Sequence, residues 1–335
     1  MAMALLSGCG TTEPAGDAGV IRVSITGEEL AVEGIPFDPM PREGQPVLVD
    51  GWSVTFDRWL IVIRDIRLNE PGPDPAQQQV VGAEVARERG PWVVDLVRQE
   101  SVELTTIRRR ADGRPFDTRV RYAFSYDIAP ADATARGMNL DAAGEEVLRQ
   151  MVAGGHAQWV EGTATRAPDM TSPFDRYPTQ VSFRFAWGGR TSQINCSNPD
   201  NGNNPETNRG VQPKQDGPQR AVITLHTEHL FYDALNVEAP TLRFDPIAAR
   251  AVPGPQGARV TLDDLAGALI VKLTDRDGRD VPDRGNLPGY MRRPGALSYD
   301  PMGAAGVTTL RDFIIYSARS MAHLNGEGLC YIERR

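Results

Sequence analysis

Apolar and polar residues alternate through much of the first two-thirds of the chain, and this pattern predicts β-strands. Alternation places successive side chains on opposite faces of a strand, as in residues 21–25 and 181–187. Residues 59–63 are continuously apolar, which indicates a strand buried on both faces. The predicted strands cover residues 21–25, 52–63, 92–96, 122–128, 159–165, 181–187 and 221–226. Short strands separated by polar loops favour a β-sandwich.

Helical periodicity interrupts the strands once and becomes common after Asp233. The stretch from Asp141 to Val152 places Val147, Leu148 and Met151 on one stripe. Later stretches that favour helices are residues 245–251, 261–273, which begins with a Thr-x-x-Asp cap, and 308–324. We therefore predict a mainly β protein. It would be a β-sandwich with a helical C-terminal appendage from about residue 237, within a single domain over residues 20–335.

Composition narrows the functional classes. The chain has 335 residues, 40% of them apolar, and a net charge of −8. This acidic balance argues against nucleic-acid binding, which requires a basic face to neutralise phosphates. No apolar run approaches the roughly 18 residues needed for a membrane-spanning helix.

The N-terminal sequence Leu6-Ser7-Gly8-Cys9 matches the lipobox of bacterial lipoproteins. In that class the cysteine, here Cys9, is acylated. Residues 11–18 then form a polar tether, so that residues 1–19 are a signal remnant and tether. The usual basic n-region is missing, and an accidental match near a cytosolic start is the alternative. The expectation is an exported periplasmic or outer-membrane lipoprotein, held to the membrane by its lipid anchor only.

Two cysteines remain, Cys196 and Cys330. In an exported chain they favour one disulfide that ties the chain end to the middle of the fold. Two independent buried thiols are the alternative.

Two of the four histidines, His226 and His229, lie three residues apart where a predicted strand runs into a helix. Imidazole is the commonest metal ligand, and such a corner restricts both rings. With Asp233 or Glu228 as a third ligand or hydrogen-bond acceptor, the pair predicts a copper or zinc site. In the alternative interpretation, both histidines cap the helix and bond to the backbone.

The other two histidines are weaker candidates. His156 joins the predicted site, with Trp159 beside it, only if the chain bends at Gly154-Gly155; core packing is the simpler role for Trp159. His323 lies seven residues before Cys330, so a disulfide would bring it toward the sandwich, although a surface position at a helix end is favoured. Residues 275–283 and 260–265 resemble degenerate calcium loops.

The chain lacks the common catalytic motifs, including Gly-x-Ser-x-Gly, His-Glu-x-x-His, the P-loop and Gly-x-Gly-x-x-Gly. Once the three cysteines are assigned to the anchor and the disulfide, no cysteine is left as a nucleophile. We therefore predict a protein that is not an enzyme.

Several segments together resemble the MbnP-like family of exported bacterial copper-binding proteins. They are residues 50–68, 119–128, 159–165 and 183–187, and the strand ending in His226. The resemblance implies a β-sandwich and a copper site built from histidines and a tryptophan oxidised to kynurenine by a di-haem peroxidase-like partner. Carried over to this chain, His226, His229 and His156 are the candidate ligands, and Trp159 or Trp187 is the oxidised residue.

The leading hypothesis is an exported, lipid-anchored, non-catalytic protein that binds a transition metal, with copper favoured over zinc or calcium. The alternative is a surface lipoprotein that contacts other envelope proteins and binds no metal. A carbohydrate-active sandwich is a third, weaker hypothesis, and it would require an exposed aromatic groove with two facing carboxylates.

Overall fold

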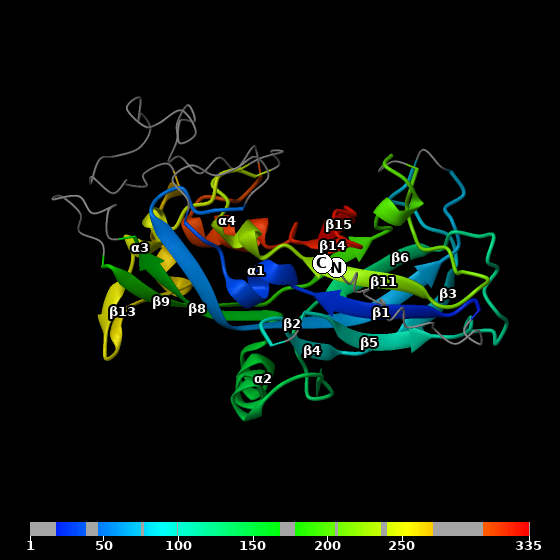
Figure 1. The fold of residues 1–335 in the computed structure, drawn as a ribbon, viewed down its shortest axis with the longest axis horizontal. Coiled ribbons are helices and arrows are strands. Elements are labelled where there is room, and N and C mark those ends of the chain that lie inside the picture. The colour runs from blue at the N-terminus through cyan, green and yellow to red at the C-terminus, as the bar shows by residue number, and fades with distance from the viewer. Residues whose placement is uncertain are drawn as a thin grey trace, which may run out of the picture.

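Two β-sheets of unequal size form the body of the molecule in the computed structural model (Figure 1). The structure describes residues 18–37, 46–74, 77–98, 100–167, 178–204, 207–235, 240–270 and 304–334. The predicted lipidation site at Cys9 and the calcium-like segment 275–283 lie outside these residues. The prediction of a mainly β, sandwich-like fold is confirmed.

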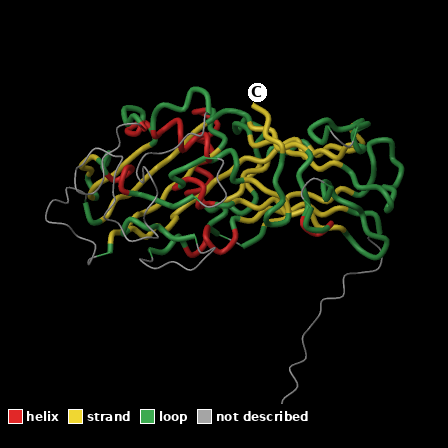
Figure 2. Tube along the Cα trace, turned by 90° about the horizontal axis from the view of Figure 1, so that it is seen from above, coloured by secondary structure: helices red, strands yellow, loops and turns green. Residues whose placement is uncertain are grey.

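The large sheet is built around β2 (Trp52–Asn69), an 18-residue strand that pairs with four other strands. Figure 2 shows strands running along the length of the molecule. The order in this sheet is β12 (Val252–Gly254), β13 (Gly257–Thr261), β9 (Gln180–Trp187), β8 (Gln158–Arg166), β2, β6 (Ala123–Ile128), β10 (Thr191–Ile194) and β15 (Tyr331–Arg334). Off this path, β3 (Glu84–Glu88) and β4 (Trp92–Asp95) pair with β2, and β7 (Arg136–Gly137) pairs with β4.

The small sheet collects four segments that are far apart in the chain. Its order is β14 (Ala322–Leu324), β11 (Gln219–Leu225), β1 (Ile21–Thr26) and β5 (Val102–Ile107). The strands β1 and β11 are parallel, and both send alternate apolar side chains into the main core. The apolar residues of the alternating pattern therefore form the inward face of this sheet.

Two hydrophobic clusters lie on opposite faces of the large sheet. On one face, the main core includes Trp59, Ile61 and Ile63 of β2. On the other face, Leu60 and Val62 join a smaller cluster under α2 (Ala142–Gly154). Figure 1 shows α2 on the side of the sheet away from α1 (Glu28–Glu33) and α4 (Leu310–Ser317). The continuous apolar run at 59–63 is thus explained, because β2 is covered on both faces here.

The predicted helix over 141–152 is confirmed as α2, whose N-cap Asp141 accepts a hydrogen bond from the amide of Gly144. The predicted helix over 261–273 is wrong for its described part, 261–270. There, Thr261 ends β13, and the side chain of Asp264 accepts hydrogen bonds from the amide and hydroxyl of Thr261 around the short turn η4 (Asp263–Leu265). The Thr-x-x-Asp motif does make the predicted side-chain-to-backbone hydrogen bonds. However, it stabilises the short 3₁₀ helix η4 and not the start of a long α-helix.

The predicted helix over 308–324 is correct only in its first half. A capping box between Thr309 and Asp312 starts α4, which ends at Ser317. The chain then becomes β14, because residues 322–324 complete the hydrogen bonding of β11. Residues 191–194 form β10 between β6 and β15.

The remaining helical elements are short: η2 (Pro199–Asn201), η3 (Thr227–Phe231) and α3 (Asp245–Ala248). The C-terminal region is therefore a mixture of helices and of strands that extend both sheets. Among the described residues, no helix combines the length and apolar character required to cross a bilayer.

Candidate metal centre

His226 and His229 flank the start of η3, directly after β11. β11 ends at Leu225, and His226 has an extended backbone at the N-cap of η3. The 3₁₀ turn brings the two imidazole rings to a centroid distance of 5.9 Å. The sequence-based prediction of a strand-to-helix corner is confirmed, with a short 3₁₀ helix in place of an α-helix.

His323 joins this pair from the C-terminal strand β14. Its register partner on β11 is Thr224, and directly paired residues share one face of a sheet. The His323 ring lies 4.3 Å from the His226 ring and 5.9 Å from the His229 ring, measured between centroids. Sequence reasoning had favoured a surface position for His323. The sequence feature that pointed to its actual position was its short separation from Cys330.

Each ring is oriented by a contact with the C-terminal segment. The Nε2 of His226 lies 3.2 Å from the carbonyl oxygen of Gly326, and the Nδ1 of His229 lies 3.0 Å from the hydroxyl of Ser320. The Nε2 of His323 lies 3.0 Å from the carbonyl of Ser320, which assigns the proton of a neutral ring to Nε2. Its Nδ1 is buried and has no hydrogen-bond partner among the described residues. In that tautomer Nδ1 carries a lone pair, which a metal ligand requires.

Three carboxylates lie beside the histidines. Glu228 Oε1 is 3.4 Å and Glu28 Oε2 is 4.0 Å from the Nδ1 of His226. Glu327 stands in the turn after β14, and ligand atoms of His226, His323 and Glu327 all lie within 4.8 Å of one another. Glu228 is nearly buried, whereas Glu327 is exposed. Glu228 therefore places a negative charge inside the site, and Glu327 places one at its surface.

Burial and these charges separate the pKa values of the three histidines. Burial alone lowers the pKa of His226, but the hydrogen bond and charge of Glu228, the carbonyl of Gly326 and the charge of Glu327 outweigh it and raise that pKa to about 9. Burial, reinforced by the positive charge on His226, lowers the pKa of His323 to about 4. Burial and the other two histidines lower the pKa of His229 well below its usual value. Two of the three rings are thus neutral at pH 7.

The donor set fits a divalent transition metal. With metal–nitrogen distances of about 2 Å and tetrahedral angles, ligating imidazoles have ring centroids roughly 5 Å apart. The measured separations of 4.3, 5.9 and 5.9 Å bracket this value. Tyr232 closes one side, with its ring 4.3 Å from that of His229. Ligand atoms of His226, His323 and Glu327 lie within 4.8 Å of one another, and His229 stands beside this group, with its ring centroid 5.9 Å from each of the other two rings.

Asp233, predicted as a ligand, is engaged elsewhere. Its carboxylate accepts hydrogen bonds from Nε of Arg243, at 2.9 Å, and from the hydroxyl of Thr241. Both charged side chains are almost completely buried. Asp233 therefore neutralises a buried arginine, and Glu327 is the better placed carboxylate.

His156 and the candidate tryptophans lie apart from the three clustered histidines. The His156 ring packs edge-on against Trp159 at 5.8 Å, and Trp159 belongs to the cluster under α2, on the opposite face of the large sheet from the main core. Trp187 lies in the main core. Among the described residues, which include all five tryptophans, the recorded ring contacts of the three histidines are with one another and with Tyr232.

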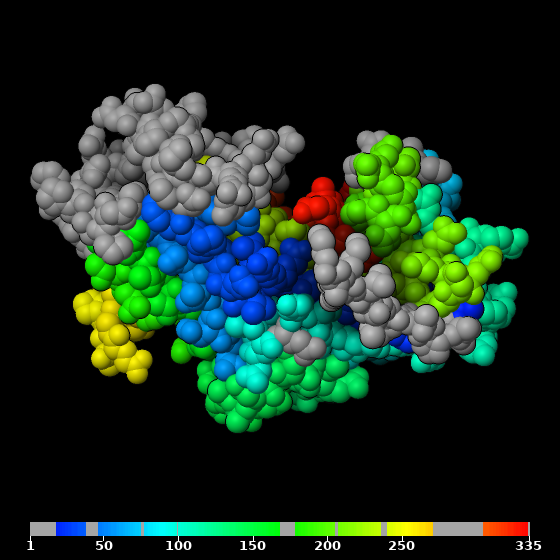
Figure 3. Space-filling model, viewed as in Figure 1, coloured from blue at the N-terminus to red at the C-terminus, as the bar shows by residue number. Residues whose placement is uncertain are grey.

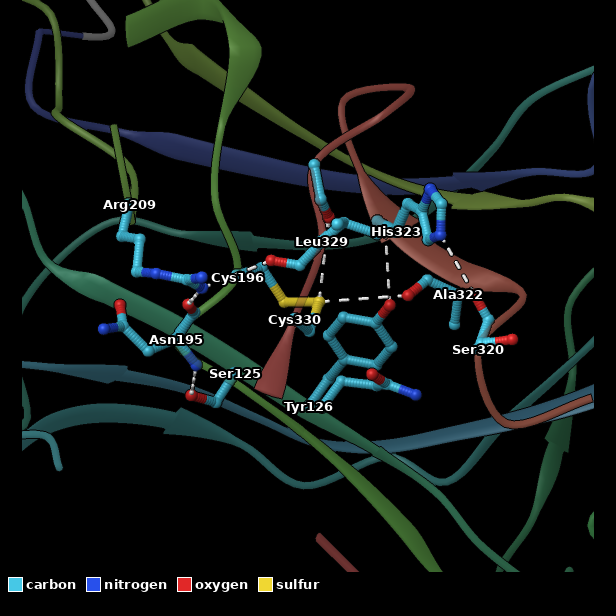
Figure 4. The surroundings of a disulfide bond; sticks show 12 residues. Ser125, Tyr126, Asn195, Cys196, Arg209, Ser320, Ala322, His323, Leu329 and Cys330 are labelled. Carbon is cyan, nitrogen blue, oxygen red and sulfur yellow. Dashed lines mark hydrogen bonds between the residues drawn. A yellow bond between two sulfur atoms is a disulfide. The ribbon is translucent and has the colours of Figure 1, made fainter. Parts of the chain in front are cut away.

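The predicted disulfide between Cys196 and Cys330 is confirmed, with an S–S distance of 1.98 Å (Figure 4). It joins the residues after β10 to the turn that follows β14, seven positions beyond His323. Figure 4 also shows Tyr126 reaching toward the backbone of His323, where its hydroxyl donates to the carbonyl at 3.3 Å. The hydrogen bond from Tyr126, which belongs to the large sheet, and the disulfide together hold β14, the strand that carries the third histidine.

Searches against models of protein families, curated proteins and solved structures found no match to this chain.

Proposed function

We propose that this protein is an exported, lipid-anchored protein that binds copper without catalysing turnover, through His226, His229 and His323. The observation that carries the proposal is the convergence of three imidazoles, two of them held neutral, around a buried unpaired nitrogen of His323. Glu327 is the candidate fourth ligand. Export and the lipid anchor rest on the Leu6-to-Cys9 motif and on the use of cysteine in a disulfide.

The nature of the donors favours copper. Imidazole ligands suit zinc, copper, iron and nickel, and copper(II) binds most tightly of the common divalent ions. Cys196 and Cys330 are joined in the disulfide, so neither supplies a thiolate ligand. Zinc is the next candidate because three histidines and an open position also suit it. Calcium is disfavoured at this cluster, since it prefers a shell made of oxygen ligands.

The experiment is a titration of metal-free protein with copper(II) against a competing chelator, compared with His323→Ala and with the double variant His226→Ala/His229→Ala. Loss of a partner that merely orients a ligand costs about 10- to 100-fold in affinity, so loss of a ligand should cost at least as much. His156→Ala is the matched control, because this histidine lies outside the cluster, and its affinity should equal that of the wild type. Equal copper binding by all four proteins would refute the assignment.

The second candidate function is an interaction module of the cell envelope. The exposed apolar side chains of Leu329, just before β15, and of Ile332, on β15, favour it, at 54% and 45% exposure. Figure 3 shows the C-terminal residues, in red, reaching the surface near the middle of the molecule. Absence of copper binding in that titration and of zinc binding in a parallel one, with the fold intact, would favour this function.

A further inference from the structure

Glu228 carries a carboxylate that is held inside the candidate metal centre. The residue lies on η3, between His226 and His229 in the chain, and is 9% exposed. Its Oε1 is 3.4 Å from Nδ1 of His226, whereas its Oε2 is buried and has no hydrogen-bond partner among the described residues. A buried carboxylate oxygen without a partner is costly unless a cation or a hydrogen-bond donor faces it. One oxygen of Glu228 is therefore left unsatisfied beside the imidazoles.

The negative charge of Glu228 has little to balance it. In the described part of the chain, His226 is the only basic side chain within ion-pair distance of Glu228. By contrast, the nearby carboxylate of Asp233 is paired with the buried guanidinium of Arg243. An imidazole ligates a metal in its neutral form. A metal ion bound by His226 would therefore become the countercharge of Glu228.

A second negative charge at the centre comes from Glu327. Its carboxylate belongs to the group in which ligand atoms of His226, His323 and Glu327 lie within 4.8 Å of one another. The two carboxylates act on the same region of the site, because burial, followed by the negative charges of Glu228 and Glu327, raises the pKa of Tyr232. With neutral imidazoles, these two carboxylates give the site two negative charges, which match the charge of a divalent ion.

We infer that Glu228 makes this centre selective for copper(II) over copper(I). The inference rests on the proposed function and adds to it the oxidation state of the ion. Two carboxylates balance the charge of copper(II), whereas copper(I) would leave one negative charge uncompensated in a largely buried site. The donor atoms point the same way, because the assembled ligands offer nitrogen and oxygen, whereas soft sulfur ligands select copper(I).

The test compares the affinities of the whole protein for copper(II) and for copper(I), each measured against a competing chelator. The copper(I) titration is anaerobic and uses ascorbate in place of a thiol, so that the disulfide stays intact. The wild type should bind copper(II) more tightly than copper(I).

The variant Glu228→Gln keeps the size of the side chain and one of its oxygens but removes its charge. The ratio of copper(II) affinity to copper(I) affinity should fall at least about tenfold, because the lost attraction is twice as large for the divalent ion. A tenfold fall corresponds to a rise of about 59 mV in the reduction potential of the bound copper, which voltammetry would measure independently.

Glu28→Gln is the matched control. It removes the same charge near the same nitrogen, since Oε2 of Glu28 lies 4.0 Å from Nδ1 of His226, but the Glu28 side chain is 44% exposed. Water and salt screen an exposed charge, so the ratio of the two affinities should change by less than about threefold. Equal shifts in Glu28→Gln and Glu228→Gln would overturn the inference, because burial of Glu228 would then give it no special role.

Two further measurements need only the wild type, so they decide the question even if Glu228→Gln fails to fold. Tighter binding of copper(I) than of copper(II) would overturn the inference. A tenfold rise in sodium nitrate concentration should change the affinity ratio by less than about threefold, because buried charges are screened much less than exposed ones. A larger fall would place the selectivity on the exposed carboxylates and would also overturn it.

The outcomes separate this inference from the proposed function. An unchanged affinity ratio in folded Glu228→Gln would overturn the role of Glu228 while leaving copper binding itself established. Binding of neither ion by the folded wild type would refute the proposed function, and the inference with it.

Discussion

His226 and His323 have ring centroids 4.3 Å apart, yet their pKa values shift in opposite directions. The difference lies in their neighbours. Glu228 and Glu327 favour the protonated form of His226, whereas His323 is buried beside that positive charge and bonds to a backbone carbonyl. The sequence indicated that His226 and Glu228 are neighbours. It did not show which histidine would be driven to the neutral form, because that depends on burial and on a residue about 100 positions away.

At the residue scale we predict that protonation of His323 destabilises the metal-free protein in acid. Its pKa is lowered from 6.5 to about 4, so its contribution to stability is complete above pH 6.5 and is lost as the pH falls toward 4. The loss between pH 7 and pH 5 should be on the order of 2 kcal/mol. Denaturant unfolding of the wild type and of His323→Gln at pH 8, 7, 6 and 5 would measure it. The variant should lose less stability than the wild type over this range. Parallel pH profiles would contradict the prediction.

Among the secondary-structure elements, the strands predicted by alternation were the most reliable, because a two-residue period survives whichever neighbour a strand pairs with. The strand β2 and the helix α2 could be recognised from their own residues. The strands β14 and β15 could not. Residues 322–324 have no strand pattern of their own and become extended because β11 offers an unpaired edge. Such pairing across about 100 residues overrides local helix preference.

At the scale of elements, we predict that the disulfide supports both stability and metal binding. It ties the segment between β14, which carries His323, and β15 to Cys196, which follows β10. The double variant Cys196→Ala/Cys330→Ala should lose about 2–5 kcal/mol of unfolding free energy in the metal-free state. Its copper affinity should also fall, because His323 and Glu327 are less firmly placed.

Denaturant unfolding and a competitive copper titration of this variant would measure the two effects. Alanine is used because free thiols would themselves bind copper. If the affinity for copper equals that of the wild type while stability is lost, then hydrogen bonding of β14 to β11 is sufficient to hold His323.

At the scale of the whole molecule, the candidate metal centre forms where four distant parts of the chain meet. They are the end of β11 with η3, the start of α1 with Glu28, the turn after α4 with Ser320, and β14 with the turn that carries Glu327. None of these parts holds the site alone. The small sheet must therefore be assembled, and the C-terminal segment must be in place, before three imidazoles converge.

For the whole mature protein we predict a lipid-modified chain with one disulfide. Intact-mass measurement of protein from its native host should give a chain that starts at Cys9, carries lipid, and lacks two hydrogens because of the Cys196–Cys330 bond. The same spectrum tests oxidation of Trp159 or Trp187 to kynurenine, which a di-haem peroxidase-like partner would perform. A mass without lipid would contradict the anchor. A mass that matches the lipidated chain without extra oxygen would contradict the modified tryptophan.

The sequence by itself determined the β character of the chain, the helix α2, the corner that carries His226 and His229, and the pairing of the two cysteines. The strands and α2 depend on local periodicity, and the corner depends on residues close together in the chain. The pairing follows because only two cysteines remain once Cys9 is assigned to the anchor. Tertiary structure alone decided that His323 completes the cluster, that Asp233 pairs with Arg243, and that His156 packs against Trp159 on the other face of the large sheet. Each of these outcomes depends on strand pairing or burial between residues distant in the chain, which local patterns do not encode.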